Sequence, residues 1–390
     1  MKPSFLERRQ ENRLVLLGAV EQVKEVLKAE TAAAEKARTL PRTSVDALRS
    51  VGLFNMKLPI ELGGAETDPV TQIEVIEAVT EINPSAAWCM FIGAAIVGLA
   101  GAFLPQKAVD QIFLNGGVPN MAGALMPGRA VRVDGGYHVT GRWSWASGIL
   151  HADWALVQTL VTFGSSVPEP RTVVFPAKQA EIIDNWHVVG LRATGSCDFT
   201  VSDLFVPEEF TYATENARPE RGGALFRMGW PGYVANEHAA FAFGLAKAAL
   251  AVIRDLGRSK TRGYGPQRAL GGRSAFQRMI AESELKLRGT RMVAVDLFER
   301  AWREASAGSV PGPALQAEMR CVASLATDTA KEIIAESVRF GAGSAVREES
   351  QLQRCLRDIN TAAAHLMVSD SAYENYGQAL LGQPDFDPMA

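Results

Sequence analysis

The chain of 390 residues is long enough to bury a large core and to form two or three structural units. Its 40 basic and 43 acidic residues give a net charge of −3 with no long block of like charge, which argues against nucleic acid as a partner. The four cysteines are far apart and have no histidine at ligand spacing, so we expect reduced core thiols and no metal site.

The first part of the chain predicts helices. Apolar residues recur at spacings of three and four between positions 11 and 39, which indicates an amphipathic helix that ends before Pro41. Ser44 is expected to cap a short helix, and Thr67 or Asp68 to start the next one.

A long apolar segment follows between residues 86 and 104, after a helix start at Pro84. It contains three glycines and is interpreted as a buried helix, not as a membrane span. The first residues of the chain lack the apolar core of a secretion signal. We therefore expect a cytoplasmic protein with an N-terminal α-helical domain of residues 1–118.

The sequence pattern changes in residues 119–212, where short segments of alternating apolar and polar residues are separated by turn residues. They predict a small antiparallel β-barrel or sandwich, with a hairpin turn at Asp134. Helical periodicity then returns in residues 213–390 and predicts an antiparallel four-helix bundle. The expected fold class is α+β, mainly α, and the four long helices are expected at 239–256, 276–306, 313–340 and 354–381.

The first candidate site lies in the segment 141–154. Trp143, Trp145 and Ser147 fall on alternate positions, so a strand would place both indoles and the hydroxyl on one face before a turn at Gly148. Two flat surfaces beside a hydrogen-bonding group suit a flat heteroaromatic cofactor. The alternative is an aromatic strand that packs in a core.

A second segment, residues 186–207, contains Gly-Leu-Arg-Ala-Thr-Gly-Ser followed by Val-Pro. Together the two segments resemble the middle domain of the acyl-CoA dehydrogenase superfamily, where similar motifs meet the flavin. Helices, a β unit and a helical bundle also follow one another in that superfamily. The resemblance implies a flavoprotein in which Trp145 and Ser147 contact the flavin ring.

The same resemblance gives weaker expectations for three further residues. Arg192 and Ser196 would supply donors around the flavin or its phosphate, although a turn stabilised by Arg192 and Asp198 is an equally good interpretation. Arg273 stands near the segment that reaches a neighbouring subunit's flavin phosphates in the superfamily. The usual R-x-x-F-G form is absent there.

One position separates two branches of the superfamily. Its dehydrogenases carry a catalytic glutamate in a Tyr-Glu-Gly-Thr segment about eight residues after an Arg-Asp pair. Here the pair is Arg357-Asp358, and His365 stands where the glutamate is expected. Glu374 follows a tyrosine but lies two helical turns, or roughly 12 Å, further along, so it is interpreted as a surface residue.

The segments 352–365 and 376–382 are similar to the flavin-dependent monooxygenase branch, which includes oxygenase components acting on 4-hydroxyphenylacetate, dibenzothiophene and indole-acetate. The resemblance implies a homotetramer that receives reduced flavin, FADH2 or FMNH2, from a separate NAD(P)H reductase. With O2 it would hydroxylate a small aromatic or heteroaromatic substrate through a C4a-hydroperoxide.

Within that branch the resemblance gives each candidate residue a role. Ser147 would hold flavin N5, and His365 would handle the proton because its intrinsic pKa lies near neutrality. Alternatively, His365 is a helix histidine satisfied by Asp358 on the same face. Trp88 and Trp143 would form dry walls of the substrate pocket, and His238 could replace a second histidine that some members carry after Trp88.

Other functions stay open at this point. The nearest alternative is an acyl-CoA dehydrogenase or oxidase with an unusual base. An N- or S-oxygenating enzyme of the same branch and a catalytically silent scaffold subunit are further possibilities. The sequence chooses neither between FMN and FAD nor among substrates.

Overall fold

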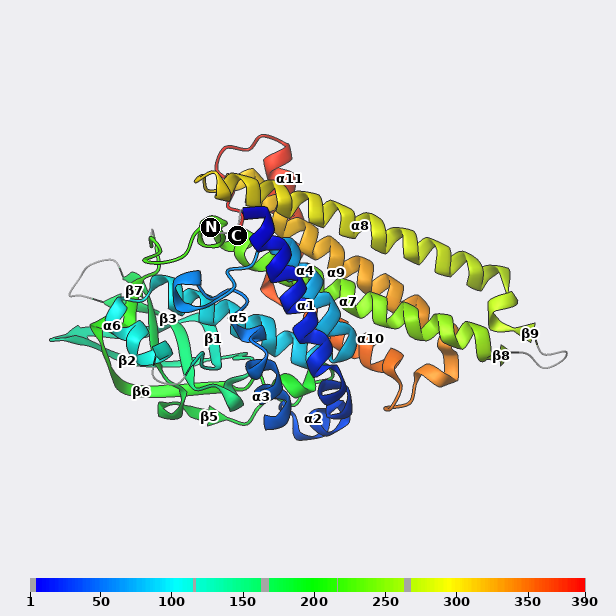
Figure 1. The fold of residues 1–390 in the computed structure, drawn as a ribbon, viewed down its shortest axis with the longest axis horizontal. Helices are drawn as coiled ribbons and strands as arrows, with labels where there is room; N and C mark the ends of the chain where they lie inside the picture. Colours follow the sequence, from blue (N-terminus) through cyan, green and yellow to red (C-terminus); the bar gives the residue numbers. More distant parts are fainter. Residues whose placement is uncertain (1–4, 115–116, 163–167, 216, 263–267, 390) are drawn as a thin grey trace. The chain divides into compact units, whose positions relative to one another are not determined.

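The computed structural model of the chain describes residues 5–114, 117–162, 168–215, 217–262 and 268–389. These residues form two compact units, which we call the sheet unit and the bundle unit (Figure 1). The sheet unit comprises Met1–Thr67, Ser85–Val188 and Arg192–Phe226, and the bundle unit comprises Asp68–Pro84, Val189–Leu191 and Arg227–Ala390. The division into three domains at residues 118 and 212 stays a prediction.

Helices precede the strands of the sheet unit. The helix expected at 11–39 is interrupted at Glu30, which separates two shorter helices. The prediction that Ser44 caps the next helix is wrong, because that helix begins at Arg42 directly after Pro41 and Ser44 is buried inside it. The helices of this unit are α1 (Phe5–Ala29), α2 (Thr31–Ala37), α3 (Arg42–Ser50), α5 (Pro84–Phe103) and α6 (Gln106–Val109).

The apolar helix α5 is a core element. Although it is long and apolar enough to cross a membrane, 83% of its apolar window is buried inside the protein. Its glycines permit close packing: a Cβ atom at Gly101 would lie 2.7 Å from Cδ1 of Leu58. The interpretation of this segment as a buried helix is therefore confirmed.

Seven strands of the sheet unit form one sheet in the order β5-β6-β2-β1-β3-β4-β7, and β8 (Thr261–Arg262) pairs with β9 (Arg268–Ala269) in the bundle unit. Neighbouring strands are antiparallel, as expected, except that β1 and β3 are parallel. The predicted turn at Asp134 joins β1 to β2, with Gly135 at φ 75°. The strands are β1 (Met121–Val133), β2 (Gly136–Trp143), β3 (Trp154–Thr162), β4 (Glu169–Pro176), β5 (Glu181–Ile183), β6 (Asp198–Pro207) and β7 (Thr211–Ala213).

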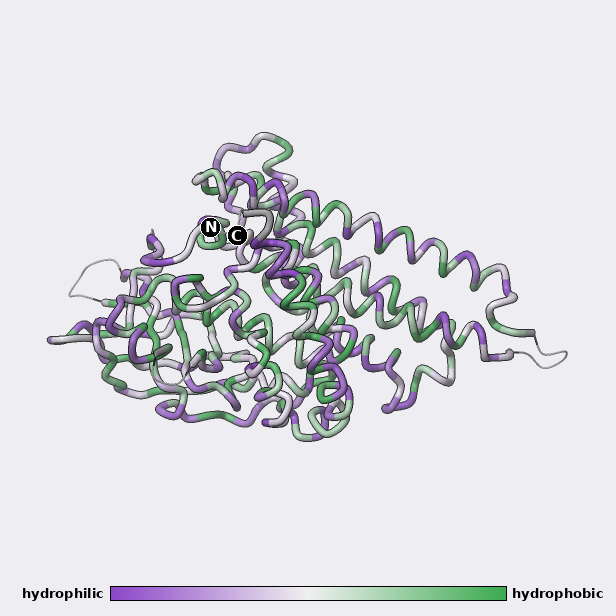
Figure 2. The backbone as a smooth tube through the Cα atoms, in the orientation of Figure 1, coloured by the Kyte–Doolittle hydropathy of each residue, from purple (hydrophilic) through white to green (hydrophobic). Residues whose placement is uncertain are grey.

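The bundle unit is built on three long helices that run side by side (Figure 1). Hydrophobic and hydrophilic residues alternate along α8 in Figure 2, as expected for a helix with one buried face. Asp68 caps α4 by accepting from the N–H groups of Val70 and Thr71, as predicted. The helices are α4 (Pro69–Ile82), α7 (Gly229–Ser259), α8 (Ser274–Ser306), α9 (Pro313–Gly341), α10 (Gln351–Ala362) and α11 (Ser371–Leu380).

A buried carboxylate holds α4 against its neighbours in the bundle unit. Glu77 of α4 accepts from Lys247 of α7 at 2.6 Å and from Arg291 of α8 at 2.6 Å. Gly244 of α7 packs so closely on α4 that a Cβ there would lie 2.6 Å from Cβ of Thr80. These contacts explain why α4 joins the bundle although it lies among the N-terminal helices in the sequence.

The fourth helix predicted for the bundle, at 354–381, is wrong. Helix α10 ends at Ala362 and α11 begins at Ser371, and between them lies a turn that we call the His365 turn, residues 363–370. Ser369 contributes to the break, because its Oγ donates to the carbonyl of Leu366 at 2.9 Å. Serine side chains that bond nearby backbone groups compete with helical hydrogen bonds.

Candidate functional site

Ser147 lies in a cluster of buried polar side chains in the sheet unit. Its Oγ is 2.8 Å from Oγ of Ser196 and accepts from Nε1 of Trp88 at 3.0 Å. Thr194 extends the chain of hydroxyls, with Oγ1 at 2.7 Å from Oγ of Ser196. We call these four residues the hydroxyl cluster. Only 7% of Ser147 and 3% of Ser196 is exposed.

The hydroxyl cluster has a direction that a ligand could set. An indole N–H can only donate, so Trp88 occupies one acceptor position on Ser147. Either serine can donate in the Ser147–Ser196 pair. When Ser196 donates, the hydroxyl hydrogen of Ser147 is available for a ligand acceptor. When Ser147 donates to Ser196 instead, its second lone pair can accept from a ligand donor, so the arrangement suits a group that makes one hydrogen bond of either direction.

Backbone hydrogen bonds fix Ser147 beside Ser196. The N–H of Gly148 donates to the carbonyl of Thr194 at 2.9 Å, and the N–H of Ala146 donates to the carbonyl of Cys197 at 3.3 Å. Gly148 has φ 80°, a conformation that glycine adopts without strain, as expected for the predicted turn. The two motifs that the sequence singled out thus lie against each other within the sheet unit.

The prediction that Trp143, Trp145 and Ser147 share one strand face is wrong. Strand β2 ends at Trp143, and Trp145 has φ 60°, so the alternation stops between them. Trp143 is fully buried, stacks on Phe199 at 5.5 Å between ring centroids and donates from Nε1 to Gln158. Trp145 is instead 68% exposed. Trp143 therefore fills the core of the sheet unit, whereas Trp145 offers an open indole surface.

Arg192 and Asp198, the two residues of the alternative turn interpretation, bond different partners. Asp198 accepts from Nε and Nη2 of Arg142 at 3.0 and 2.7 Å, and this pairing helps to hold the pKa of the Asp198 carboxyl below its usual range against the opposing effect of burial. Arg192 donates from Nε to the carbonyl of Val188 at 3.1 Å. Arg273 is exposed immediately before α8.

In the bundle unit, the Arg-Asp pair grips the start of the Gly-Leu-Arg motif. The N–H of Leu191 donates to Oδ1 of Asp358 at 2.6 Å, and Nη1 of Arg357 donates to the carbonyl of Val189 at 2.7 Å. A Cβ atom at Gly190 would overlap the carbonyl group of Arg357. The glycine is therefore required by close backbone packing, independently of any ligand.

His365 is not a helix residue, so the interpretation that places it on one helix face with Asp358 is wrong. It follows the end of α10, and its Nδ1 accepts from the N–H of Met367 at 3.2 Å. A neutral ring that accepts at Nδ1 carries its proton on Nε2. The His365 turn thus orients the imidazole and selects its tautomer.

A second imidazole faces His365. The ring of His238 on α7 is 4.3 Å away between centroids and inclined by 33°, and His238 is buried. His365 keeps an exposed side, yet the desolvation from surrounding protein lowers its pKa to about 4. Protonation at Nδ1 would also break the bond from Met367. The ring is therefore neutral at physiological pH and able to accept or relay a proton.

Glu374 behaves as expected for a surface residue. It is exposed on α11, and the tyrosine before it, Tyr373, donates from its hydroxyl to Oδ2 of Asp328 at 2.9 Å. Tyr373 therefore helps to pack α11 on α9, and Glu374 next to it is a surface residue.

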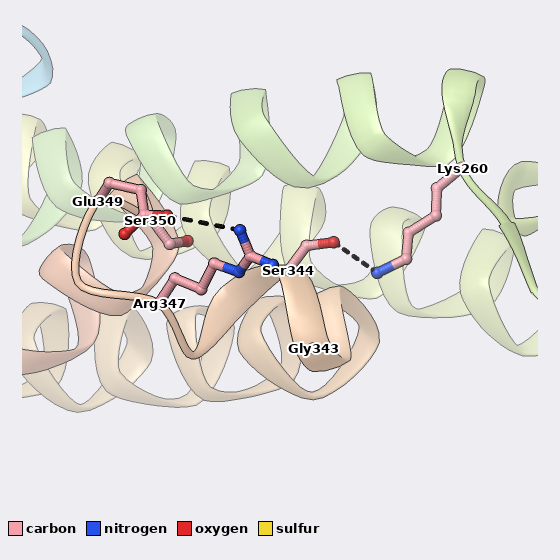
Figure 3. A pocket seen from close by; sticks show the side chains of 6 residues that line it. All are labelled: Lys260, Gly343, Ser344, Arg347, Glu349 and Ser350. Atoms are coloured by element: carbon pink, nitrogen blue, oxygen red, sulfur yellow. Dashed lines mark hydrogen bonds and ion pairs between the residues drawn. The ribbon is translucent and has the colours of Figure 1, made fainter.

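A pocket of about 570 Å³ lies at the C-terminal end of α7 in the bundle unit (Figure 3). Lys260 reaches across it, donating from Nζ to the carbonyl of Gly341 at 2.7 Å and to Oγ of Ser344 at 2.8 Å. Arg347 adds a second cation to the lining. The lining also includes Glu349, whose carboxylate lies 3.8 Å from Nη1 of Arg347, and no residue predicted from the sequence lines the pocket.

Two polar residues of these regions were not predicted from the sequence. Thr194 joins the hydroxyl cluster, and its signal was its place two residues before Ser196 in the same motif. Arg320 of α9 is fully buried and donates to the carbonyl of Leu366 in the His365 turn. No signal in the sequence marked it, since Gln316, Glu318 and Ser324 also interrupt the apolar residues of this part of the helix.

Comparison with known proteins places the chain in a family. The family model "Acyl-CoA dehydrogenase, N-terminal domain" matches residues 9–103, and "Acyl-CoA dehydrogenase, C-terminal domain" matches residues 237–370. Indole-3-acetate monooxygenase of Pseudomonas putida is 28% identical over 350 residues, which cover 90% of this chain and 89% of that protein.

Further relatives agree with this assignment. The flavin-dependent monooxygenase oxygenase subunit HsaA of Mycobacterium tuberculosis is 27% identical over 387 residues, covering 96% of this chain and 97% of that protein. The solved structure of XiaF from Streptomyces sp., in complex with FADH2 and glycerol, has a TM-score of 0.88 and 26% identity, with 98% of both chains covered. The chain belongs to the acyl-CoA dehydrogenase superfamily, in its flavin-dependent monooxygenase branch.

Proposed function

We propose that this chain is the oxygenase component of a two-component monooxygenase that uses reduced flavin and O2 to hydroxylate a small aromatic or heteroaromatic compound. The names of the relatives support the substrate class, since they include an indole-3-acetate monooxygenase and a resorcinol hydroxylase. The observation that carries the proposal is the hydroxyl cluster, because it presents one buried, directed hydroxyl on Ser147.

The hydroxyl cluster fits a reduced flavin ring, whose N5 carries a hydrogen and donates a hydrogen bond. Oγ of Ser147 would accept from N5–H, Ser196 would fix Ser147 by accepting its hydroxyl hydrogen, and Trp145 would offer its exposed indole to the flat ring. Arg192 and Arg273 remain candidate donors to flavin or its phosphates. When bound, reduced flavin activates O2 for transfer of one oxygen atom to the substrate.

In the bundle unit, His365 would take and return the proton that hydroxylation of an aromatic ring displaces. Its neutral ring has the state that a proton acceptor needs, and desolvation, which lowers its pKa to about 4, makes it a weaker base than a free imidazole. His238 would lie next in line, with its ring 4.3 Å from that of His365 between centroids. Trp88 would exclude water near Ser147, since its indole is buried.

Two partners belong to this proposal. A separate NAD(P)H:flavin reductase would supply the reduced flavin, as the words "oxygenase subunit" and "oxygenase component" in the names of relatives imply for those proteins. A second copy of the chain would cover α8, which leaves Leu285, Met292 and Val293 exposed at helical spacing. We propose a homotetramer.

The test is a single-turnover experiment. The protein, loaded anaerobically with reduced flavin, is mixed with ¹⁸O2-saturated buffer and a phenol or indole substrate. We expect one ¹⁸O atom in the hydroxylated product and, without substrate, a transient absorbance between about 370 and 390 nm before oxidised flavin appears. Peroxide as the sole oxygen product with every phenol and indole tested would contradict the proposal.

The same protein also separates the proposal from the dehydrogenase alternative. Oxidised flavin on the protein is mixed anaerobically with acyl-CoA thioesters in the absence of any reductase. We expect the flavin spectrum to stay unchanged, because His365 replaces the glutamate that the dehydrogenases use. Bleaching of the flavin by a thioester would favour the dehydrogenase.

A further inference from the structure

Arg320 lies on α9 and contacts two segments that follow it 46 and 68 residues later in the chain. Its side chain is fully buried. The guanidinium donates from Nη2 to the carbonyl of Leu366 at 3.1 Å and to Oγ of Ser371 at 2.9 Å, and from Nη1 to the carbonyl of Pro388 at 3.1 Å. One side chain therefore binds both the His365 turn and the C-terminal segment.

The contacts of Arg320 bracket the break between α10 and α11. Leu366 directly follows His365, and Ser371 is the first residue of α11. Ser369 lies between them, with Oγ at 3.1 Å from Nη2 of Arg320 and at 2.9 Å from Oγ of Ser371. Because the guanidinium is rigid and planar, these bonds fix the two ends of the turn relative to each other.

The His365 turn also fixes the imidazole ring of His365. The carbonyl of His365 accepts from the N–H of Val368 at 3.0 Å, and Nδ1 accepts from the N–H of Met367. Both donors belong to the short 3-10 turn at Leu366–Val368, whose first carbonyl is the one that Arg320 binds. Movement of this turn would release Nδ1 and allow the ring to rotate.

We propose that Arg320 is a positioning residue for His365: its guanidinium holds the His365 turn so that the ring proton stays on Nε2 and points away from the turn backbone. The inference rests on the proposed role of His365 as the group that handles the proton. It assigns to Arg320 a task that a merely stabilising core residue would not have.

The geometry explains why arginine is needed at this position. The same nitrogen, Nη2, serves a carbonyl and two hydroxyls, while Nη1 reaches the C-terminal segment. A lysine keeps the charge but presents a single rotatable donor group and cannot hold both segments in one plane. Arg320→Lys is therefore the informative variant, since it retains a buried cation and removes the planar guanidinium with its two donor nitrogens.

The first measurement is NMR on protein with ¹⁵N-labelled histidine, which has five imidazole rings and two nitrogen signals from each. His365→Gln identifies the signal of interest, and His238→Gln identifies that of the facing ring. We expect a single Nε2–H tautomer of His365 in the original chain and a mixture of both tautomers in Arg320→Lys. An unchanged tautomer in Arg320→Lys would overturn the proposal.

A second variant covers the case in which Arg320→Lys fails to fold. Ser371→Ala removes one acceptor of the guanidinium at the start of α11 and keeps Arg320 itself. We expect a smaller shift of the His365 signals in the same direction. The matched control is Arg339→Lys, which changes an exposed arginine on the same helix and should leave these signals unaltered.

Activity measurements separate this inference from the proposed function. In Arg320→Lys we expect kcat for hydroxylation to fall about tenfold or more while flavin affinity and KM stay within about twofold, because the misplaced group acts in the chemical step. Partial rescue of Arg320→Ala by millimolar guanidinium is the expected confirmation. If His365→Gln is fully active, the proton role fails, while the tautomer result still decides whether Arg320 positions the ring.

Discussion

The hydroxyl cluster and the His365 turn hold their polar groups in different ways. In the cluster, neutral side chains bond one another: Trp88 to Ser147 and Ser147 to Ser196. In the His365 turn, a buried charged group, Arg320, binds the backbone and the hydroxyls that surround His365. The first arrangement contains no imidazole, whereas the second surrounds one, whose pKa is lowered to about 4 by desolvation.

This difference indicates what each region can contribute. Serine and tryptophan side chains keep their protons at all physiological pH values, so the hydroxyl cluster can only orient a ligand by hydrogen bonds. The imidazole of His365 can accept a proton and release it again. Variants in the two regions should therefore change different kinetic quantities, and the following experiments compare them.

The largest effect is expected for His365→Gln. Glutamine keeps a hydrogen-bonding side chain but cannot carry a proton, so the hydroxylation rate should fall about 100-fold, within the usual range for general acid–base groups. Rapid-quench measurement of product in a single turnover gives this rate. The control is His138→Gln, which alters a histidine paired with Asp203 on the sheet surface and should leave the rate unchanged.

The sequence predicted the parts of both regions that depend on local signals. Asp68 and Pro84 start α4 and α5 as expected, because a capping carboxylate and a proline at the first turn act within a few residues. The segments that carry Ser147 and Ser196 were recognised from their motifs. Their meeting in one cluster was implied by the resemblance, although neither motif states a contact between them.

Contacts between distant segments account for what the sequence did not predict. At the break in the helix predicted at 354–381, Arg320 of another helix bonds residues on both sides. The parallel pairing of β1 with β3 and the positive φ of Trp145 likewise arise from tertiary packing. The alternation of Trp143 and Trp145 predicted that both side chains lie on one strand face. The left-handed backbone at Trp145 ends the strand pattern, so they do not.

The second prediction concerns Ser147→Ala in the hydroxyl cluster. Loss of the hydroxyl removes the acceptor proposed for flavin N5–H and leaves Nε1 of Trp88 without its acceptor on Ser147. We expect product formed per O2 consumed to fall about tenfold, with a matching rise in H2O2, and the free energy of unfolding to fall by about 1–3 kcal/mol. Oxygen-electrode and peroxide assays measure the first quantity, and urea unfolding measures the second.

A matched serine tests whether this effect is specific. Ser202 is exposed on β6, the strand that directly follows the motif of Ser196, so Ser202→Ala should change neither coupling nor stability. Equal coupling in the Ser147→Ala and Ser202→Ala proteins would remove the proposed role of the hydroxyl cluster in flavin binding.

A smaller effect is expected for Trp88→Phe. The phenyl ring retains most of the buried apolar surface but lacks the N–H that donates to Ser147. Ser147 then has no indole donor to orient it, and we expect a two- to threefold loss of coupling with about 1 kcal/mol of stability. The combination Trp88→Phe with Ser147→Ala should be no worse coupled than Ser147→Ala alone, because both changes act through one hydrogen bond.

The smallest effect is expected from pH, and it distinguishes the two regions most directly. The pKa of His365 is lowered to about 4 in the folded protein from an ordinary value of 6.5. The ring therefore stays neutral down to pH 5, and the hydroxylation rate should vary little between pH 5.5 and 8.

The free energy of unfolding, in contrast, should depend on pH in this range. Below pH 6.5 the unfolded chain binds a proton that folded His365 does not, so this residue lowers stability as the pH falls from 6.5 towards 4. Urea unfolding at pH 7 and pH 5 should therefore show a smaller loss of stability for His365→Gln than for the original chain, whereas Ser147→Ala should retain the full loss. An acid limb near pH 6.5 in the hydroxylation rate would instead mean that His365 is protonated in the folded protein under working conditions and donates a proton first.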